Sequence, residues 1–596
     1  MFLDQNIIGG LQKGLLEDCY AVLPELILCG TLLLLLLLRL FSSLDNWHLG
    51  WETLTLTLIA LVAAFMQWQP LNGPPSLTNE APFADFPRDL FGGFASGLLR
   101  YDNFVLFFRL FLISFTALTI VLSMLTGIPD REDSADFYTL LLGASVGMLL
   151  MAMANHLLMV FIAVEMASLP SFALAGFLKG KRQSSEAALK YVVYGGGASG
   201  IMLYGISLLA GKFGTGYLND LAQVVPEAVA AAGTDPILLL GFLFIFIGLA
   251  FKLSVVPFHF WCPDVFEGAA AEVAGFLSVA SKGAALALTA RLALVLVGPV
   301  QFAVPELNAQ FTTPLAAYII FSLCFFAAIT ATFGNLAAYP QTNLKRMLAY
   351  STIAHAGYMV MGLATLRSEG VSAVLFYLVV YLLTNLGAFA CVAFLRNQTG
   401  SEDLSSFRGL IYRSPLLVIV FACFLLSLLG LPPLAGFAAK FQIFQVLYDT
   451  AQLHSLDASR WLQLSTEPGI NDATYAQRAG LAATETNLSY ALFGLLVVGG
   501  VNTVFSVVYY LNALKVMIID KPLDEVEGRA PQPIVLPAGS ALYATVLAVG
   551  VLVVGILWNP LVVASNRGVA HFNRSEGGAL PVARALPPAD AEVRLP

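Results

Sequence analysis

Residues 249–268 read LAFKLSVVPFHFWCPDVFEG, an apolar run that two prolines interrupt. Pro257 and Pro263 follow shortly after Lys252, which stands in the apolar part of the run. Proline lacks a backbone N–H group and clashes with the preceding helical turn, so the stretch predicts a helix that breaks here. Lys252 is also notable, because a charged side chain is costly inside a membrane.

A second break is predicted in the C-terminal half. Residues 415–447 form an apolar run that is too long for one straight helix across a bilayer, and the segment 428–441, LLGLPPLAGFAAKF, interrupts it. Gly430, Pro432 and Pro433 predict a discontinuous helix. Two broken segments in two parts of one chain are typical of transport proteins with inverted repeats. The alternative is that these prolines only kink packed helices.

The composition excludes a soluble protein. Of the 596 residues, 58% are hydrophobic and 11% are charged, whereas soluble domains carry about 25% charged residues. The apolar runs do not alternate apolar and polar residues as membrane β-barrel strands do. We predict an all-α polytopic membrane protein with about fourteen transmembrane helices, near residues 21–41, 51–68, 102–127, 136–153, 157–178, 187–211, 236–257, 271–298, 313–337, 347–366, 371–395, 415–447, 490–514 and 537–563.

These spans divide the chain into four predicted regions. They are an N-terminal region of three helices (1–128) with a polar outside loop near 69–100, a first five-helix repeat (136–298), a second five-helix repeat (313–515) with a polar outside insertion near 448–488, and a last helix with an outside tail (516–596). The broken helix is the fourth of each repeat. Lys and Arg gather in alternate short loops, so the positive-inside rule places both termini on the outer face of an inner membrane.

Several ionisable residues stand inside predicted spans. Glu165, Lys252, Lys282 and Lys440 are each surrounded by apolar sequence. Such residues are kept mainly where they line a polar pathway, and a buried lysine can bind and release a proton near neutral pH. Four such charges along one chain indicate a proton relay. The alternative for each lysine is that its ammonium group reaches the membrane surface.

Three further residues are candidates for the same relay. Lys190 follows Glu186 by one helical turn, so these two can form an ion pair, and snorkelling is an equal alternative for this lysine near a span start. His259 lies at the first break and His355 lies within the tenth predicted span. Histidine suits proton passage because its ordinary pKa is near neutrality, although a buried histidine can simply be a hydrogen-bonded core residue.

Other intramembrane charges are weaker candidates. Arg109 and Arg291 have snorkelling as their simplest explanation, and Glu272 has the start of a helix.

Six segments resemble a known family, the antiporter-like membrane subunits of respiratory complex I (NADH-quinone oxidoreductase). Three details favour the subunit N type: the form of PFHFWCPDVFEG, the EAALKY block, and Lys440 where the subunit M type usually has glutamate. The resemblance covers roughly residues 100–515. The segments are VEMASLPSFALAGF (164–177), EAALKYVVYGGGASG (186–200), FKLSVVPFHFWCPDVFEG (251–268), FLSVASK (276–282), NLKRMLAYSTIAHAGY (343–358) and LGLPPLAGFAAKF (429–441).

The resemblance implies a fold and roles for the charged residues. The fold has fourteen helices in which each five-helix inverted repeat carries one broken helix. Glu165 is paired with Lys252, Lys282 is the central connecting lysine, Lys440 is the terminal lysine of the second half-channel, and Lys190 is an accessory lysine. His259 and His355 match the polar axis of that family.

The sequence departs from the family pattern at the start of one helix. After residues 267–268 the family usually has A-P-T-P-V, whereas residues 269–273 read AAAEV, so two prolines are lost and Glu272 appears. Polar insertions near 69–100 and 448–488 and a tail from about 566 also make the chain longer than is usual. We expect these segments to contact partners or to be partly disordered.

The resemblance implies a proton-translocating subunit of complex I, coupled to NADH:quinone electron transfer in other subunits. The alternatives are a subunit of a multisubunit Na⁺/H⁺ antiporter or of a membrane-bound hydrogenase-type complex, and a passive membrane scaffold. The six cysteines are scattered without a CxxC pair, so no redox centre or metal site is predicted on this chain. NADH, FMN, iron–sulfur clusters and quinone are expected in partner subunits, and neighbouring antiporter-like subunits and the lipid bilayer are the expected contacts.

Overall fold

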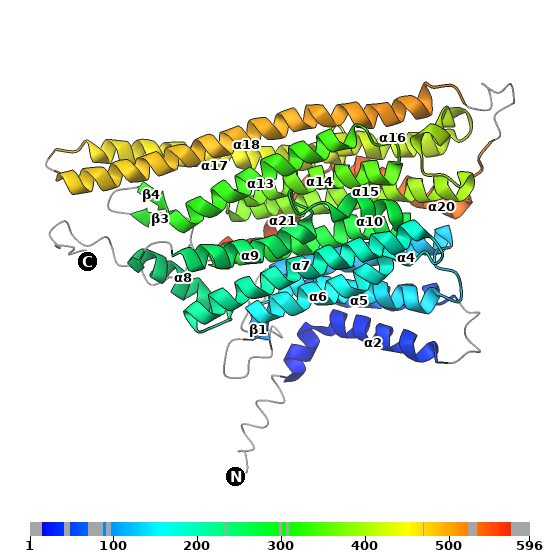
Figure 1. Ribbon diagram of the computed structural model, residues 1–596, viewed down its shortest axis with the longest axis horizontal. Helices are drawn as coiled ribbons and strands as arrows, with labels where there is room; N and C mark the ends of the chain where they lie inside the picture. Colours follow the sequence, from blue (N-terminus) through cyan, green and yellow to red (C-terminus); the bar gives the residue numbers. More distant parts are fainter. Residues whose placement is uncertain are drawn as a thin grey trace, which may run out of the picture.

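A computed structural model describes residues 15–40, 48–68, 88–90, 97–232, 235–296, 301–304, 309–468, 470–522 and 533–573. Most of these residues are helical, and the longer helices lie side by side in one bundle (Figure 1). The helices are α2 (Leu23–Leu38), α3 (Gly50–Trp68), α4 (Asn103–Thr126), α5 (Ser134–Met153), α6 (Leu157–Ala175), α7 (Arg182–Phe213), α8 (Leu218–Ala232), α9 (Pro236–Leu253), α10 (Trp261–Gly268), α11 (Ala271–Phe276), the π-helix η3 (Leu277–Ser281), α12 (Lys282–Leu296), α13 (Pro314–Ala338), α14 (Leu344–Leu363), α15 (Ser368–Thr399), the 3₁₀ turns η5 (Leu404–Phe407) and η6 (Leu410–Tyr412), α16 (Pro415–Leu429), α17 (Ala435–Ser465), α18 (Asp472–Ile518), α20 (Ala538–Ile556), α21 (Asn559–Gly568) and α22 (Ala570–Asn573).

The number of clear spans is smaller than the predicted fourteen. Within the described ranges, 11 helices are long and apolar enough to cross a membrane, or up to 12 if one bent pair at the N-terminus counts as a span. The expected span 347–366 corresponds to α14, which has the required length but carries two basic residues and His355. The expected span 415–447 is divided between α16 and α17. Helices that are broken or that carry charge therefore account for part of the difference between the predicted and the observed number of spans.

The first interruption separates α9 from α10. Helix α9 ends at Leu253, and Ser254 turns the backbone with a φ of +59°. The indole nitrogen of Trp261, the first residue of α10, donates to the carbonyl of Phe251 at 2.9 Å. The backbone N–H of Val256, inside the gap, donates to Thr330 Oγ1 of α13 at 3.0 Å. Buried backbone groups need such partners when a helix stops inside a protein.

The second interruption separates α16 from α17. Gly430 follows the last residue of α16 and has a φ of +94°, which favours glycine because a side chain would be strained there. Helix α17 resumes at Ala435, and the N–H of Gly436 donates to Ser427 Oγ at 3.1 Å. Hydrogen bonds across the gap thus hold the two helix ends close together.

The predicted polar insertion at 448–488 is mostly helical. Helix α17 continues to Ser465 and α18 begins at Asp472, so the two form a long antiparallel hairpin along one edge of the bundle (Figure 1). His454 and Glu485 form a buried pair at 2.5 Å, and Glu485 also accepts from the backbone N–H of Thr312 at 2.6 Å. The expectation of partial disorder is wrong for this hairpin, because it is helical on both sides and a buried hydrogen bond between His454 and Glu485 joins its two helices.

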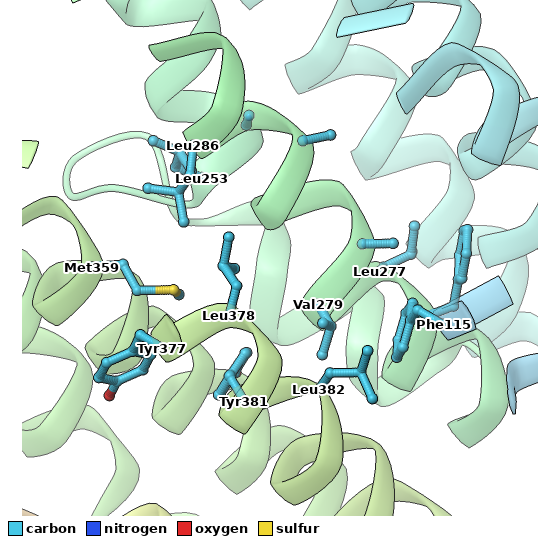
Figure 2. Close-up of a cluster of buried hydrophobic side chains, with 14 of the residues drawn as sticks. Phe115, Leu253, Leu277, Val279, Leu286, Met359, Tyr377, Leu378, Tyr381 and Leu382 are labelled. Atoms are coloured by element: carbon cyan, nitrogen blue, oxygen red, sulfur yellow. The ribbon is translucent and has the colours of Figure 1, made fainter. Parts of the chain in front are cut away.

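Apolar side chains fill the space between the central helices. Figure 2 shows Val279 of η3 beside Leu382 of α15, and Leu277 of η3 on the side of Phe115 of α4, within the main core cluster. Tyr377 and Tyr381, also on α15, lie in the same layer (Figure 2).

Two short hairpins of strands lie at the ends of the helices. Strands β1 (Arg88–Leu90) and β2 (Leu99–Tyr101) pair antiparallel, and so do β3 (Gln301–Val304) and β4 (Ala309–Thr312). Neither hairpin belongs to a larger sheet among the described residues. They close connections between helices at the surface of the bundle.

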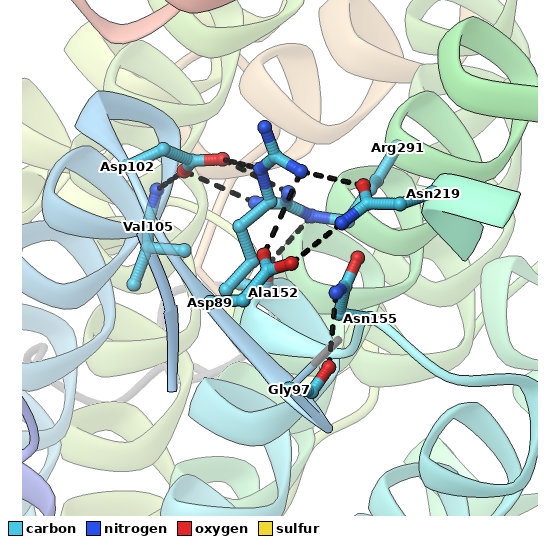
Figure 3. A network of polar contacts seen from close by, with 9 residues as sticks. Asp89, Gly97, Asp102, Val105, Ala152, Asn155, Asn219 and Arg291 are labelled. Carbon is cyan, nitrogen blue, oxygen red and sulfur yellow. Dashed lines mark hydrogen bonds and ion pairs between the residues drawn. The ribbon is translucent and has the colours of Figure 1, made fainter. Parts of the chain in front are cut away.

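A buried polar network ties β1 and β2 to the helices (Figure 3). Asp102 caps the start of α4 and forms two hydrogen bonds with Arg291 of α12, at 2.9 and 3.1 Å. Asn219 of α8 donates to Asp89 at 2.6 Å. Snorkelling, the simplest prediction for Arg291, is wrong because the guanidinium is buried and paired.

Arg109 is the second arginine for which snorkelling was expected. It is fully buried in α4, and its Nε lies 2.8 Å from Glu25 of α2. Its Nη1 donates to Gln67 of α3 at 2.5 Å. The ion pair with Glu25 and the hydrogen bond to Gln67 therefore join α4 to α2 and α3, and the arginine does not reach the surface.

Candidate functional site

Lys252 lies at the end of α9, one residue before the first interruption. Its side chain is buried, and its Nζ has no hydrogen-bond partner among the described residues. The ammonium nitrogen is 5.9 Å from the ring centroids of both Phe172 and Tyr191. Aromatic faces attract a cation weakly, so they can receive a protonated lysine without fixing it there.

Glu165 lies in the middle of α6 and is half-buried. It accepts a hydrogen bond from Ser199 of α7. It interacts electrostatically with Lys252, but the two side chains form no hydrogen bond in the described part of the chain. In this conformation Glu165 and Lys252 are therefore not in direct contact. Ser199, and not the lysine, is the hydrogen-bond donor to Glu165.

His259 lies inside the first interruption and its side chain is buried. Its ring is 4.5 Å from the ring of Phe333 on α13, and its Nδ1 has no hydrogen-bond partner within the described ranges. The charge of Lys282 is near enough to disfavour a protonated His259. A neutral imidazole with a free ring nitrogen can accept a proton from a neighbouring donor.

Lys282 is the first residue of α12 and directly follows the π-helix η3. It is completely buried, and its Nζ has no hydrogen-bond partner in the described structure. A π-helical turn inserts an extra residue into a helix and frequently occurs at functional sites. Here it determines which way Lys282 points from the α11–η3–α12 segment.

His355 is held between two tyrosines in the centre of α14. Its Nδ1 is hydrogen-bonded to the hydroxyl of Tyr377 at 2.7 Å, and its Nε2 is 3.3 Å from the hydroxyl of Tyr510. The ring of Tyr381 is stacked at 5.1 Å. A small cavity of about 10 Å³ adjoins His355 and is also lined by Ser427 and Gly436 near the second interruption. Sequence reasoning missed these tyrosines, because aromatic residues in an apolar span carry no separate signal.

Lys440 lies in the first turns of α17, beside the second interruption. Its Nζ donates to the carbonyl of Leu429, the last residue of α16, at 2.9 Å. The same nitrogen is 4.7 Å from the ring centroid of Tyr358. Both Lys252 and Lys440 lie beside a helix interruption, Lys252 before the first and Lys440 after the second.

Electrostatic interactions group these residues in two sets. Lys252 interacts with Glu165, His259 interacts with Lys282, and His355 interacts with both Lys282 and Lys440. Burial without a fixed counter-ion makes a lysine or histidine able to exchange a proton.

Lys190 lies nearer the surface than these buried residues. It is partly exposed and forms ion pairs with Glu186 at 2.8 Å and with Asp264 at 2.6 Å. The predicted pair with Glu186 is therefore confirmed. Arg346 completes the group through Asp264 at 2.8 Å and Glu267 at 2.6 Å. In this structure Lys190 joins α7 to α10 at the end of the bundle.

The described residues contain no group of three or more His, Cys, Asp or Glu side chains that could hold a metal ion. The functional groups brought together are amines, imidazoles, hydroxyls and one carboxylate. These groups transfer protons and do not themselves carry electrons.

Comparisons with known proteins show the family of the chain. Residues 154–459 match the family model described as NADH:quinone oxidoreductase/Mrp antiporter, TM. A protein from Anaeromyxobacter sp. named NADH-quinone oxidoreductase subunit N is 38% identical over 477 residues, which cover 78% of this chain and 83% of the relative. One from Sorangium cellulosum, named subunit N 2, is 35% identical and covers 90% of this chain and 94% of the relative.

A solved structure has the same fold. A chain of respiratory complex I from Thermus thermophilus with bound Aureothin superimposes with a TM-score of 0.64 at 29% identity, covering 91% of this chain and 100% of that chain. The match extends over nearly the whole bundle and is not limited to the region of the family model. This chain therefore belongs to the family of NADH:quinone oxidoreductase and Mrp antiporter membrane subunits, and within it to NADH-quinone oxidoreductase subunit N.

Proposed function

We propose that this subunit moves protons across the membrane along the file Glu165, Lys252, Lys282, His355 and Lys440, with His259 beside the first interruption. The observation that carries the proposal is the burial of Lys252 and Lys282 without a hydrogen-bond partner among the described residues. Burying such an amine costs free energy, and no structural ion pair offsets that cost. Reversible protonation is the function that the geometry supports best.

The file works as a two-state element. When the Glu165 carboxylate approaches Lys252, the pair favours the charged amine. When Glu165 returns to Ser199, the amine loses that support and its proton passes on toward Lys282. The hydrogen bond from Ser199 to Glu165 supports this, because it gives the carboxylate a second resting place. The quinone chemistry of other subunits would bias the choice between the two states.

The finer architecture is part of the proposal. We take α9 with α10, and α16 with α17, as two discontinuous helices, each the fourth of a five-helix inverted repeat covering 136–298 and 313–515. With the predicted arrangement of basic loops, both termini then lie on the outer face of the inner membrane. The regions 1–128 and 516–596 flank the two repeats. Broken helices expose backbone groups near the membrane centre, where ions are transferred in this type of fold.

The cofactors and partners follow from the family. NADH, FMN, iron–sulfur clusters and quinone would be bound by other subunits of the complex, and other membrane subunits, including neighbouring antiporter-like ones, would contact this chain. Exposed apolar side chains on α7 and α18, among them Val193, Tyr204 and Val504, support a lipid or membrane-protein environment. Lys190 would act as an accessory lysine at the end of the file.

A different function is a subunit of a multisubunit Na⁺/H⁺ antiporter or of a hydrogenase-type complex. The family model that matches this chain also covers the Mrp antiporters. Purification of the intact complex distinguishes the two: copurified iron–sulfur and quinone-binding subunits support the oxidoreductase, whereas small antiporter subunits support the antiporter.

The central test is the double substitution Lys252→Ala with Lys282→Ala in the assembled complex. NADH-driven proton translocation into membrane vesicles, normalised to the amount of complex, should be lost, because two buried proton acceptors are removed. Lys212→Ala is the matched control, since Lys212 lies at the end of α7 in an ion pair with Asp235 outside the file. Proton translocation that continues in the double variant would exclude the relay.

A further inference from the structure

The segment that carries Lys282 begins at an unusual helix start. Helix α11 is only six residues long and leads through η3 into Lys282. Its N-cap residue is Ala270, whose side chain cannot cap the exposed N–H groups. Something else must therefore fix the direction in which this short helix enters the bundle.

Two ion pairs lie at this helix start. Glu272, completely buried in the first turn of α11, contacts Arg396 of α15 through two oxygens at 3.0 and 3.5 Å. Lys345, the second residue of α14, lies 2.9 Å from Glu402. Lys345 also donates to the carbonyl of Ala269, between α10 and α11, at 2.7 Å. We call these four side chains, Glu272, Arg396, Lys345 and Glu402, the ionic clamp.

The clamp joins elements that belong to different predicted repeats. Glu272 and Ala269 belong to the first, and Lys345, Arg396 and Glu402 belong to the second. The two pairs also interact with each other, because the charge of Lys345 interacts with the charges of Arg396 and Glu272. Movement of α10 or α11 would therefore have to break charge-assisted hydrogen bonds to α14 and α15, which are stronger than neutral ones.

Helix α15 extends the clamp toward Lys282. Asn385 precedes Arg396 by 11 residues, about three helical turns, so the two side chains share one face of the helix. Asn385 donates to Ser278 Oγ in the π-helix. One face of α15 thus holds the start of α11 through Arg396 and the π-helical turn before Lys282 through Asn385.

We propose that the ionic clamp positions Lys282 by fixing the start of α11 against α14 and α15. The inference rests on the proposed role of Lys282 in the file. Glu272 lies ten residues before Lys282, about 15 Å along a helix, so it acts through the backbone and not by proton exchange with the lysine. Glu272, Arg396, Lys345 and Glu402 are positioning residues.

The first test is Glu272→Gln in the assembled complex. It should reduce the rate of NADH-driven proton translocation by up to about a hundredfold, since a misplacement of about 1 Å can slow a reaction by this factor. Arg367→Gln is the matched control, because Arg367 precedes the other end of α15 in an exposed pair with Glu369. Arg396→Lys keeps the positive charge but removes the planar guanidinium group that binds both carboxylate oxygens. It replaces Glu272→Gln in this test if the Glu272→Gln complex does not assemble. Unchanged translocation in an assembled clamp variant would overturn the proposal.

A rescue distinguishes positioning from direct proton transfer. Ala270 has a φ of −60°, which proline adopts without strain, and proline is tolerated in the first turn of a helix. The variant Ala270→Pro with Glu272→Pro and Arg396→Gln replaces the charges by a rigid backbone. Restored proton translocation supports the clamp, whereas no recovery in an assembled complex shows that the charge itself is required and overturns it.

The single variant Lys282→Met separates this proposal from the relay. If Lys282→Met translocates protons normally, the file is wrong. If Lys282→Met is inactive and Glu272→Gln is fully active, only the clamp is wrong.

Discussion

The ammonium group of Lys440 donates to the carbonyl of Leu429 across the second interruption, at 2.9 Å. A helix that stops inside a bundle leaves its last carbonyls without intrahelical partners, and a cation is favourable at that end. The broken helix therefore provides Lys440 with a neutral acceptor in place of a carboxylate. Such an acceptor holds the lysine in position without forming a permanent ion pair.

Gly430→Ala should disturb this arrangement. A Cβ at residue 430 would lie 3.1 Å from Cδ of Lys440, and the φ of +94° disfavours any side chain. We expect a loss of stability of about 1–2 kcal/mol together with reduced proton translocation. Thermal unfolding of the purified complex and vesicle acidification measure the two effects.

Gly400→Ala is the control for that substitution. Gly400 also has a positive φ, of +70°, but its Cβ would meet nothing within 4 Å. It should lose stability without losing translocation. Equal losses of translocation in both variants would contradict a specific role for the space beside Lys440.

Tyr377→Phe should slow proton translocation while leaving the fold intact. The substitution removes the hydroxyl that lies 2.7 Å from His355 Nδ1 and leaves a buried imidazole nitrogen without that partner, at a cost of about 1–3 kcal/mol. Translocation normalised to assembled complex is the measurement. Tyr448→Phe, at an exposed position on α17, should behave like the wild type.

Asp102→Asn should destabilise the subunit by about 3–5 kcal/mol, because it leaves the buried guanidinium of Arg291 without its counter-ion. Thermal unfolding of the complex measures the loss. Adding Arg291→Met should recover much of it, since the second change removes the unpaired charge. If the losses of stability of the two single variants simply add in the double variant, the interaction between Asp102 and Arg291 does not contribute to stability.

Asp457→Asn should stabilise the α17–α18 hairpin at neutral pH. Burial, and next the nearby carboxylate of Glu485, raise the pKa of Asp457 above its ordinary value. A carboxyl group with a raised pKa binds its proton more tightly in the folded state, so stability falls as the pH rises through the folded pKa. The uncharged asparagine side chain does not ionise, so the variant does not lose stability in this way.

The pH dependence provides the check. The gain in melting temperature should be present at pH 7 and should disappear below the ordinary pKa of 3.8, where the native Asp457 is protonated. A gain that is independent of pH would indicate that repacking, and not charge, is responsible.

Much of the fold was predictable from residue types. Apolar runs predicted the membrane helices, and the expected breaks near Pro257 and Gly430 fall where α9 and α16 end. The hairpin at 448–488 was not predicted as ordered, because its helices expose many polar side chains and its buried pair, His454 with Glu485, joins residues 31 positions apart. The composition of a segment indicates only its local preference for order or disorder, whereas a contact between distant residues forms only in the folded chain.

The sequence by itself determined which residues are costly inside a membrane. Glu165, Lys252, Lys282 and Lys440 could be selected because charge in hydrocarbon is expensive wherever the helix lies. Only the tertiary structure decided their partners: Ser199 for Glu165, the Leu429 carbonyl for Lys440, and none among the described residues for Lys252 and Lys282. It likewise separated the paired Arg109 and Arg291 from the file. The physical reason is that desolvation depends on residue type and surroundings, whereas a hydrogen bond or an ion pair needs two groups within a few ångströms, often from distant parts of the chain.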